Sequence, residues 1–100
     1  MLETENKMFG KKLTKQAVDN LISKGAKLYD VRDPVSFRDG TLPGATNLAL
    51  RNVMSINKLD KKQKLIFYSK SADDVDLNMV MNYAHQFGFT DIYYILSTLT

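Results

Sequence analysis

The sequence contains no cysteine. A chain without cysteine forms no disulfide, offers no thiolate to a metal ion and has no sulfur nucleophile for catalysis. It also lacks any apolar run close to the ~20 residues that span a bilayer, so no membrane contact is expected. Residues 1–7 are polar and acidic, where a signal peptide would be basic and then apolar. We therefore expect a cytoplasmic protein.

The charged residues are of mixed sign, with 14 Lys and Arg against 11 Asp and Glu in a chain of 100 residues. The lysines gather in two groups, Lys7, Lys11, Lys12 and Lys15, and Lys58, Lys61, Lys62 and Lys64. A nucleic-acid surface would interleave arginine and exposed aromatic residues with such lysines, and these are missing. We therefore expect the lysines to be solvated surface residues. Weak nucleic-acid binding through them is kept as a hypothesis for function, behind the two that are given at the end of this section.

The most informative stretch is Lys64–Tyr68 with the residues that follow it. Its four consecutive apolar residues predict a strand that is buried on both faces, as at the centre of a parallel sheet. A polar loop comes next, and Asp76–Phe87 then carries apolar residues at helical spacing until Gly88 stops the helix. Because such loops direct their N–H groups toward one point, residues 69–75 are the first candidate site.

The remaining segments alternate between helices and strands. Asp33-Pro34 is a strong helix start, with the aspartate as N-cap and the proline in the first turn. The other expected elements are a loose lead-in over residues 1–12, a helix from Thr14 to Gly25, strands at 26–31, 45–48 and 90–96, a turn at 41–46 and a helix at 50–59. This order predicts an α/β fold with a central, mostly parallel sheet of about four or five strands flanked by helices.

Several of these motifs, in this order and spacing, resemble the signature of rhodanese-like domains. They are Asp30-Val31-Arg32-Asp33, Phe37, Gly40–Leu48, Leu65–Tyr68 and Gly88–Tyr93, within about residues 14–96. The resemblance implies a three-layer α/β/α domain over residues 13–100, shorter at its C-terminus than the family. It also assigns structural roles to Asp30 and Arg32 at a strand end and to Pro43 and Gly44 in a turn.

Rhodanese-like enzymes carry sulfur as a persulfide on one cysteine at the start of the loop after the central strand. The matching position here is Ser69, whose hydroxyl is barely ionised at neutral pH and forms no persulfide. Sulfur transfer by the family mechanism is therefore excluded, and no cofactor is expected. Serine catalysis is not expected either, because the only histidine, His85, follows about 16 Å further along a helix.

The vestigial loop departs from the family pattern in other ways. It consists of Ser69, Lys70, Ser71, Ala72, Asp73, Asp74 and Val75. Ala72 replaces a glycine, Asp74 stands where a loop arginine is common, and Thr41 replaces the usual histidine of the turn. Our hypothesis is that Asp73 or Asp74 takes the place of an anionic substrate. No metal site is expected there, because these neighbouring carboxylates at a helix start do not converge and capping explains them.

The sequence thus favours a non-enzymatic rhodanese-like domain that acts as a protein-interaction or accessory module. The alternative is a degenerate enzyme, or a binder of anions or small ligands, that uses the loop at 69–75. Strand residues Tyr93–Leu96 lack the helix that follows them in the family, so apolar surface should be left uncovered beside them. An unknown protein partner or a second copy of the chain would cover this edge, unless the N-terminal twelve residues fold back over it.

Overall fold

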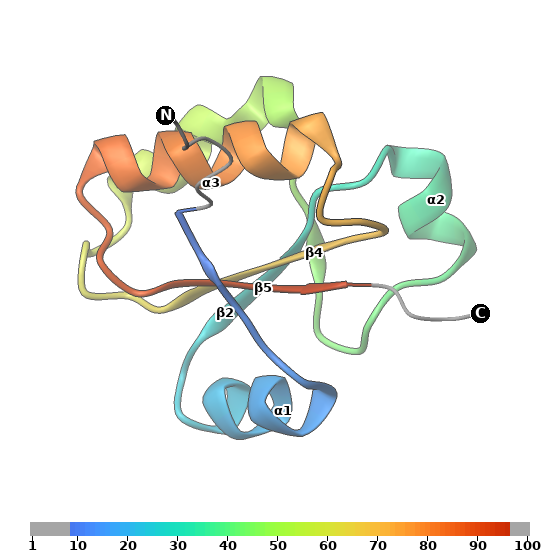
Figure 1. Cartoon of the computed structure of the whole chain (residues 1–100), viewed down its shortest axis with the longest axis horizontal. Helices are drawn as coiled ribbons and strands as arrows, with labels where there is room; N and C mark the ends of the chain where they lie inside the picture. The colour runs from blue at the N-terminus through green and yellow to red at the C-terminus, as the bar shows by residue number, and fades with distance from the viewer. Residues whose placement is uncertain (1–8, 97–100) are drawn as a thin grey trace, which may run out of the picture.

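The structure, a computed structural model, describes residues 9–96 and contains a five-stranded parallel sheet in the order β1-β5-β4-β2-β3. The elements follow one another as β1 (Lys11–Lys12), α1 (Lys15–Ser23), β2 (Lys27–Asp30), α2 (Pro34–Asp39), β3 (Thr46–Asn47), the 3₁₀ helix η1 (Leu50–Lys58), β4 (Leu65–Ser69), α3 (Val75–Phe87) and β5 (Ile92–Leu96). Helix α1 covers one face of the sheet, and α3 and η1 cover the other (Figure 1). The three-layer α/β/α fold is therefore confirmed.

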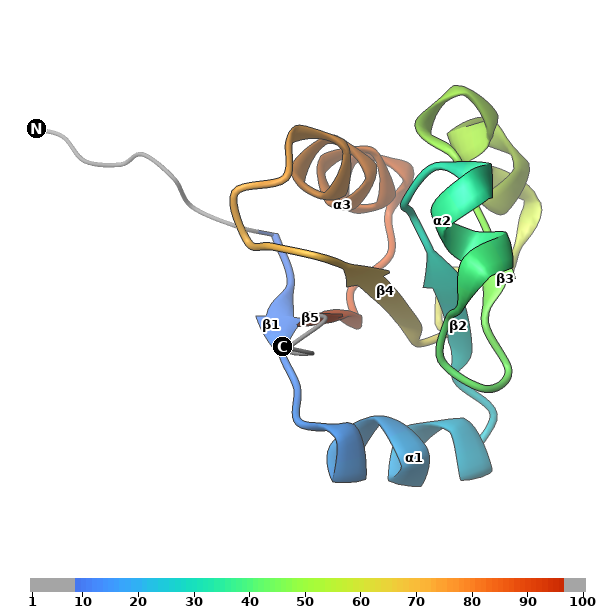
Figure 2. The ribbon, with the colours of Figure 1, turned by 90° about the vertical axis from the view of Figure 1, so that its right-hand side faces the viewer.

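Strand β4 lies at the centre of the sheet, between β5 and β2. All five of its residues are buried, as the apolar run predicted. Alternate side chains point to opposite faces, so Leu65 and Phe67 pack in the core beneath α3, while Ile66 and Tyr68 pack in the smaller core against α1. Figure 2 shows these two layers edge-on, with α1 alone below the sheet.

The helix boundaries follow from local capping. The Thr14 hydroxyl accepts a hydrogen bond from the Ala17 N–H at 3.2 Å, and the Asp33 carboxylate accepts one from the Ser36 N–H at 2.8 Å, ahead of Pro34. Helix α3 ends at Gly88, which has a φ of 107°. These starts and stops are the ones that the sequence predicted.

The structure differs from the expected loose lead-in at the end of that segment. Lys11 and Lys12 form strand β1, which pairs in parallel with Tyr93 and Tyr94 of β5. Just before it, the ring of Phe9 stacks on His85 at 4.4 Å between centroids. A two-residue strand of lysines carries no hydrophobic periodicity, so it could not be predicted from the sequence pattern.

The expected helix at 50–59 is a 3₁₀ helix over Leu50–Lys58. Its buried residues, Val53 and Ile56, are three positions apart, and this spacing matches the three residues per turn of a 3₁₀ helix. Strand β3 is limited to two residues within the expected 45–48 segment. Among residues 9–96, no helix has both the length and the apolar character needed to pass through a membrane.

Candidate functional site

The polar residues of interest gather at the carboxyl ends of β2 and β4. These two neighbouring strands are parallel, but the chain continues from them toward opposite edges of the sheet. It passes from β2 to β3 at one edge and from β4 to β5 toward the other edge. Ligands of open α/β sheets bind in the crevice at such a switch point. Helix α2 lies at the same end of the sheet (Figure 1).

Ser69 is the last residue of β4 and is fully buried. Its hydroxyl donates a hydrogen bond to one carboxylate oxygen of Asp74 at 2.6 Å. The other oxygen of Asp74 accepts a hydrogen bond from the Asp76 N–H at 3.2 Å, as befits the N-cap of α3. A carboxylate from the protein itself therefore lies against the residue that begins the loop.

Other residues of the loop make hydrogen bonds within the loop and to Asn78 of α3. The Asp73 N–H donates to the Ser71 hydroxyl at 3.0 Å, and the Asp74 N–H donates to the Ser71 carbonyl at 3.2 Å. The Asn78 amide donates to the carbonyls of Ala72 and Asp74, both at 2.9 Å. The N–H groups of Asp73, Asp74 and Asp76 thus already have acceptors within the protein, and an anion in this loop would have to replace them.

The other chemical candidates of the loop do not come together. Lys70, Asp73, Val75 and Asp76 are exposed. Within residues 9–96, no three carboxylate, histidine or cysteine side chains are arranged to hold a metal ion. His85 lies near the far end of α3 and stacks on Phe9. The structure therefore brings Asp74, and not His85, to Ser69.

A buried ion pair joins the end of β2 to the turn before β3. Asp30 is fully buried and accepts hydrogen bonds from the backbone N–H, Nε and Nη2 of Arg32 at 2.9, 3.0 and 2.7 Å. The Thr41 hydroxyl donates to the same carboxylate at 2.7 Å. These hydrogen bonds with Asp30 raise the pKa of Arg32. The guanidinium, so fixed, lies 4.8 Å from the centre of the Tyr68 ring.

Two residues of this network were not singled out by sequence. The sequence marks Thr41 as part of the turn and as the replacement of a histidine, and it marks Asn47 only as a member of the motif Gly40–Leu48, with no role for either side chain. The Asn47 amide donates to the carbonyls of Asp30 at 2.9 Å and Arg32 at 3.0 Å. The contacts of Thr41 and Asn47 with Asp30 join residues more than ten positions apart in the sequence. The only sequence signal for a role of Thr41 and Asn47 was therefore that they are polar and lie in or near a turn. Pro43 and Gly44, by contrast, are exposed within the turn, where Gly44 has a φ of 86°.

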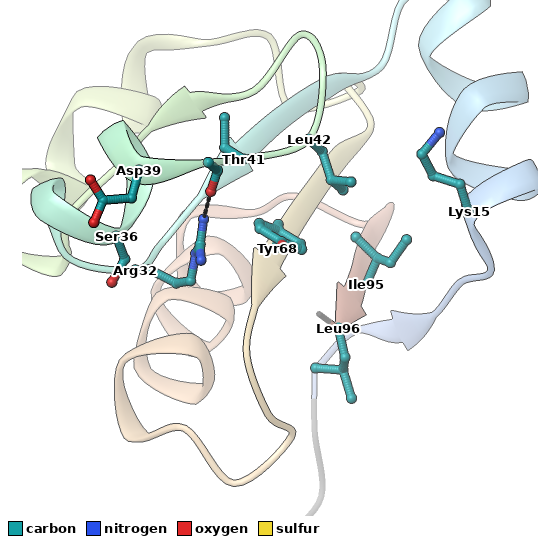
Figure 3. A pocket seen from close by; sticks show the side chains of 10 residues that line it. Lys15, Arg32, Ser36, Asp39, Thr41, Leu42, Tyr68, Ile95 and Leu96 are labelled. Carbon is teal, nitrogen blue, oxygen red and sulfur yellow. Dashed lines mark hydrogen bonds between the residues drawn. The ribbon is translucent and has the colours of Figure 1, made fainter. Parts of the chain in front are cut away.

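A cavity of about 680 Å³ opens at the same end of the sheet, on the α1 face. It is lined by Lys15, Arg32, Ser36, Asp39, Gly40, Thr41, Leu42, Tyr68, Ile95 and Leu96 (Figure 3). None of these residues belongs to the loop at 69–75. Tyr68 and Ser69 point to opposite faces of β4, so Tyr68 lines the cavity and Ser69 does not, although Leu96, the register partner of Ser69 in β5, also lines it.

A family model for the rhodanese-like domain matches residues 14–98. The chain belongs to the rhodanese-like domain family. The resemblance drawn from the motifs is thereby confirmed, in a member of the family that has no cysteine. No curated protein matches the sequence.

Solved structures show the same fold at low sequence identity. A human single-domain sulfurtransferase, TSTD1, has a TM-score of 0.67 and 19% identity, with 89% of each chain covered. The single-domain sulfurtransferase RDL2 of Saccharomyces cerevisiae has a TM-score of 0.68 and 20% identity over 90% of this chain and 85% of its own. Reduced CoADR-RHD of Bacillus anthracis has a TM-score of 0.69 and 15% identity over 87% of this chain but 15% of that protein.

Proposed function

We propose that this rhodanese-like domain is not a sulfurtransferase and serves in the cytoplasm as a protein-interaction or accessory module. The observation that carries the proposal is the hydrogen bond between buried Ser69 and Asp74. Sulfane transfer requires a thiolate at the start of the loop and room for an anionic donor beside it. In this chain the hydroxyl of Ser69 stands in place of the thiolate, and the carboxylate of Asp74 occupies the room that an anionic donor would need.

The charge of Asp74 works against the reaction as strongly as the loss of sulfur does. A carboxylate beside a thiol raises the pKa of that thiol and repels a dianion such as thiosulfate. Restoring cysteine alone would therefore give a poor nucleophile. Ser69 and Asp74, which are joined by a hydrogen bond, therefore both oppose sulfur transfer.

The alternative uses of the molecule find less support. An anion in the loop would compete with Asp74 and with hydrogen bonds that the loop already makes. The second group of lysines lies at the end of η1 and in the connection to β4. Two of its members are engaged, since Lys61 donates to the Asn57 side chain at 2.8 Å and Lys64 pairs with Asp91 at 3.2 Å. Nucleic-acid binding would also show a steep loss of affinity with salt.

The proposal is tested by an assay in which thiosulfate gives up its outer sulfur to cyanide, forming sulfite and thiocyanate. The wild-type chain, Ser69→Ala, Ser69→Cys and the double variant Ser69→Cys/Asp74→Gly are compared, with a known rhodanese as positive control. We expect wild type to equal Ser69→Ala. We also expect the double variant to exceed Ser69→Cys by about tenfold or more, since a one-unit fall in the thiol pKa gives about that change in thiolate.

Two results would count against the proposal. Thiocyanate formed by wild type above the Ser69→Ala background would show a sulfurtransferase that needs no cysteine. Equal rates for the single and double cysteine variants would show that Asp74 does not restrain the loop. Circular dichroism of each variant establishes that the fold is retained.

A further inference from the structure

The cavity on the α1 face is lined by no residue of the vestigial loop at 69–75. Its floor is apolar and is formed by Leu42 from the turn, Tyr68 from β4 and Ile95 from β5, with Leu96 at its rim (Figure 3). Its volume of about 680 Å³ lies within the 300–1,000 Å³ typical of small-molecule sites. The second core on this face is small, because α1 is the one helix that covers it (Figure 2).

Cationic groups flank this apolar floor on both sides. Figure 3 shows Arg32 on one side and Lys15 on the other, with Tyr68 and Ile95 between them. Arg32 is held rigidly by Asp30 and stacks on the Tyr68 ring. Within the described residues, its Nη1 has no hydrogen-bond partner, whereas Nε and Nη2 are both engaged. This nitrogen is therefore free to bind an acceptor.

Lys15 adds a second, more mobile charge. Its only ion pair in the described structure is with Asp19 at 3.1 Å, and both side chains are more than half exposed. Such an exposed pair contributes little to stability, so Lys15 can readily exchange Asp19 for the carboxylate of a ligand. Lys15 is also the first residue of α1, so the positive end of that helix lies at the cavity. Asp39 is the one carboxylate among the lining residues, at the last position of α2.

We propose that this cavity binds a small organic carboxylate with an apolar, preferably aromatic, body. The body packs on Leu42, Tyr68 and Ile95, and the single carboxylate is bound by Lys15 at one flank, while the guanidinium of Arg32, already paired with Asp30, lines the opposite flank. The site lies at the switch point between β2 and β4, where the fold places ligands. It goes beyond the proposed function and holds whether or not the loop at 69–75 is catalytic.

The probes for the test are 3-phenylpropionate, its neutral amide and acetate, titrated into the full chain. The readout is the NMR signal of methyl groups labelled in leucine and isoleucine. We expect 3-phenylpropionate to shift the methyls of Leu42, Ile95 and Leu96 in a saturable manner, while Leu65 and Ile56 in the other core stay unchanged. Acetate, which lacks the apolar body, should give no saturable shift, and the amide should bind more weakly than the acid.

Lys15, the first residue of α1, and Lys24, its C-cap residue, are both exposed and provide a matched pair of substitutions. Lys15→Gln should weaken the acid about threefold and leave the amide unchanged, the size expected for one exposed charge pair. Lys24→Gln removes the same charge at the far end of the helix and should change neither. Leu42→Trp, which fills the cavity, should abolish binding of both probes; if it unfolds the chain, Lys15→Gln still decides the matter.

Three results would overturn the proposal. The first is the absence of saturable shifts at Leu42, Ile95 and Leu96. The second is equal affinity for acid and amide, which would remove the carboxylate from the ligand class. The third is an equal effect of Lys15→Gln and Lys24→Gln, which would indicate general charge attraction. None of these readouts involves sulfur transfer, so failure here and failure of the proposed function are distinguishable.

Discussion

At the scale of single residues, Asp74 has two roles that can be separated. Its carboxylate caps helix α3 and also accepts the hydrogen bond of buried Ser69. Glycine is tolerated at an N-cap at a cost of only a few tenths of a kcal/mol. Asp74→Gly would therefore spare the helix but leave the Ser69 hydroxyl and the Asp76 N–H without their acceptor.

We expect Asp74→Gly to lower the free energy of unfolding by about 1–3 kcal/mol, the cost of a buried donor without a partner. Sulfate should then recover part of the loss, because it can accept from the same two donors and stabilises the state that binds it. The measurement is the thermal midpoint in sodium sulfate against sodium chloride at equal ionic strength.

Asp73→Gly is the matched control, since it removes the same charge from an exposed neighbour. It should show no preference for sulfate over chloride. If Asp74→Gly and Asp73→Gly respond alike to sulfate, Asp74 does not stand in for an anion.

Another residue-scale feature explains why part of the site was not foreseen. The family resemblance implied structural roles for Asp30 and Arg32 at a strand end, and the two side chains form an ion pair at 2.7 Å. The further partners, Thr41 and Asn47, come from the next turn and strand. Their pairing depends on how β2 and β3 align, which a local pattern does not encode. The cavity is likewise formed by residues that lie far apart in the chain, from Lys15 to Leu96, so no single stretch of sequence predicts it.

At the scale of elements, the sequence predicted the helices and strands that are determined by the residues within them. Four apolar residues at 65–68 require a strand buried on both faces, and Asp33-Pro34 and Gly88 fix helix ends by their own backbone preferences. Strand β1 was missed because its stability comes entirely from pairing with β5. Such a strand is defined by its neighbour and not by its own two lysines.

The pairing of β1 leads to a prediction about one of these lysines. The Leu13 N–H donates to the Tyr94 carbonyl at 2.8 Å, so two residues earlier the Lys11 N–H also faces β5, while the Lys12 N–H faces away. Proline removes the N–H at either position. We expect Lys11→Pro to lower the free energy of unfolding by about 1–2 kcal/mol and Lys12→Pro to lower it by clearly less.

Urea denaturation of the two variants measures this difference, and hydrogen exchange of β5 amides locates it. The two substitutions remove the same charge and add the same ring, so only the direction of the N–H differs. Equal destabilisation would mean that β1 does not pair with β5 in the register described.

At the scale of the whole molecule, the edges of the sheet bear on how the chain associates. The sequence predicted that an unknown protein partner or a second copy of the chain would associate through Tyr93–Leu96. In the structure β1 covers β5 at Tyr93 and Tyr94, so strand pairing there would have to displace β1. Both outer strands, β1 and β3, have two residues each, and β1 consists of lysines. Short edges and edge lysines oppose the pairing of sheets.

We therefore expect the wild-type chain to be a monomer at micromolar concentrations, with a mass of 11.4 kDa by analytical ultracentrifugation. Lys11→Pro should self-associate more than Lys12→Pro, because it uncovers the backbone of β5. A wild-type dimer that persists in Lys12→Pro would contradict this view and would favour the other apolar surface, the α1 face. In that case addition of 3-phenylpropionate distinguishes a dimer formed through the α1 face from one formed through the edge of β5. A ligand bound against Leu42 and Ile95 would compete with a second copy docked on the α1 face and would dissociate only that dimer.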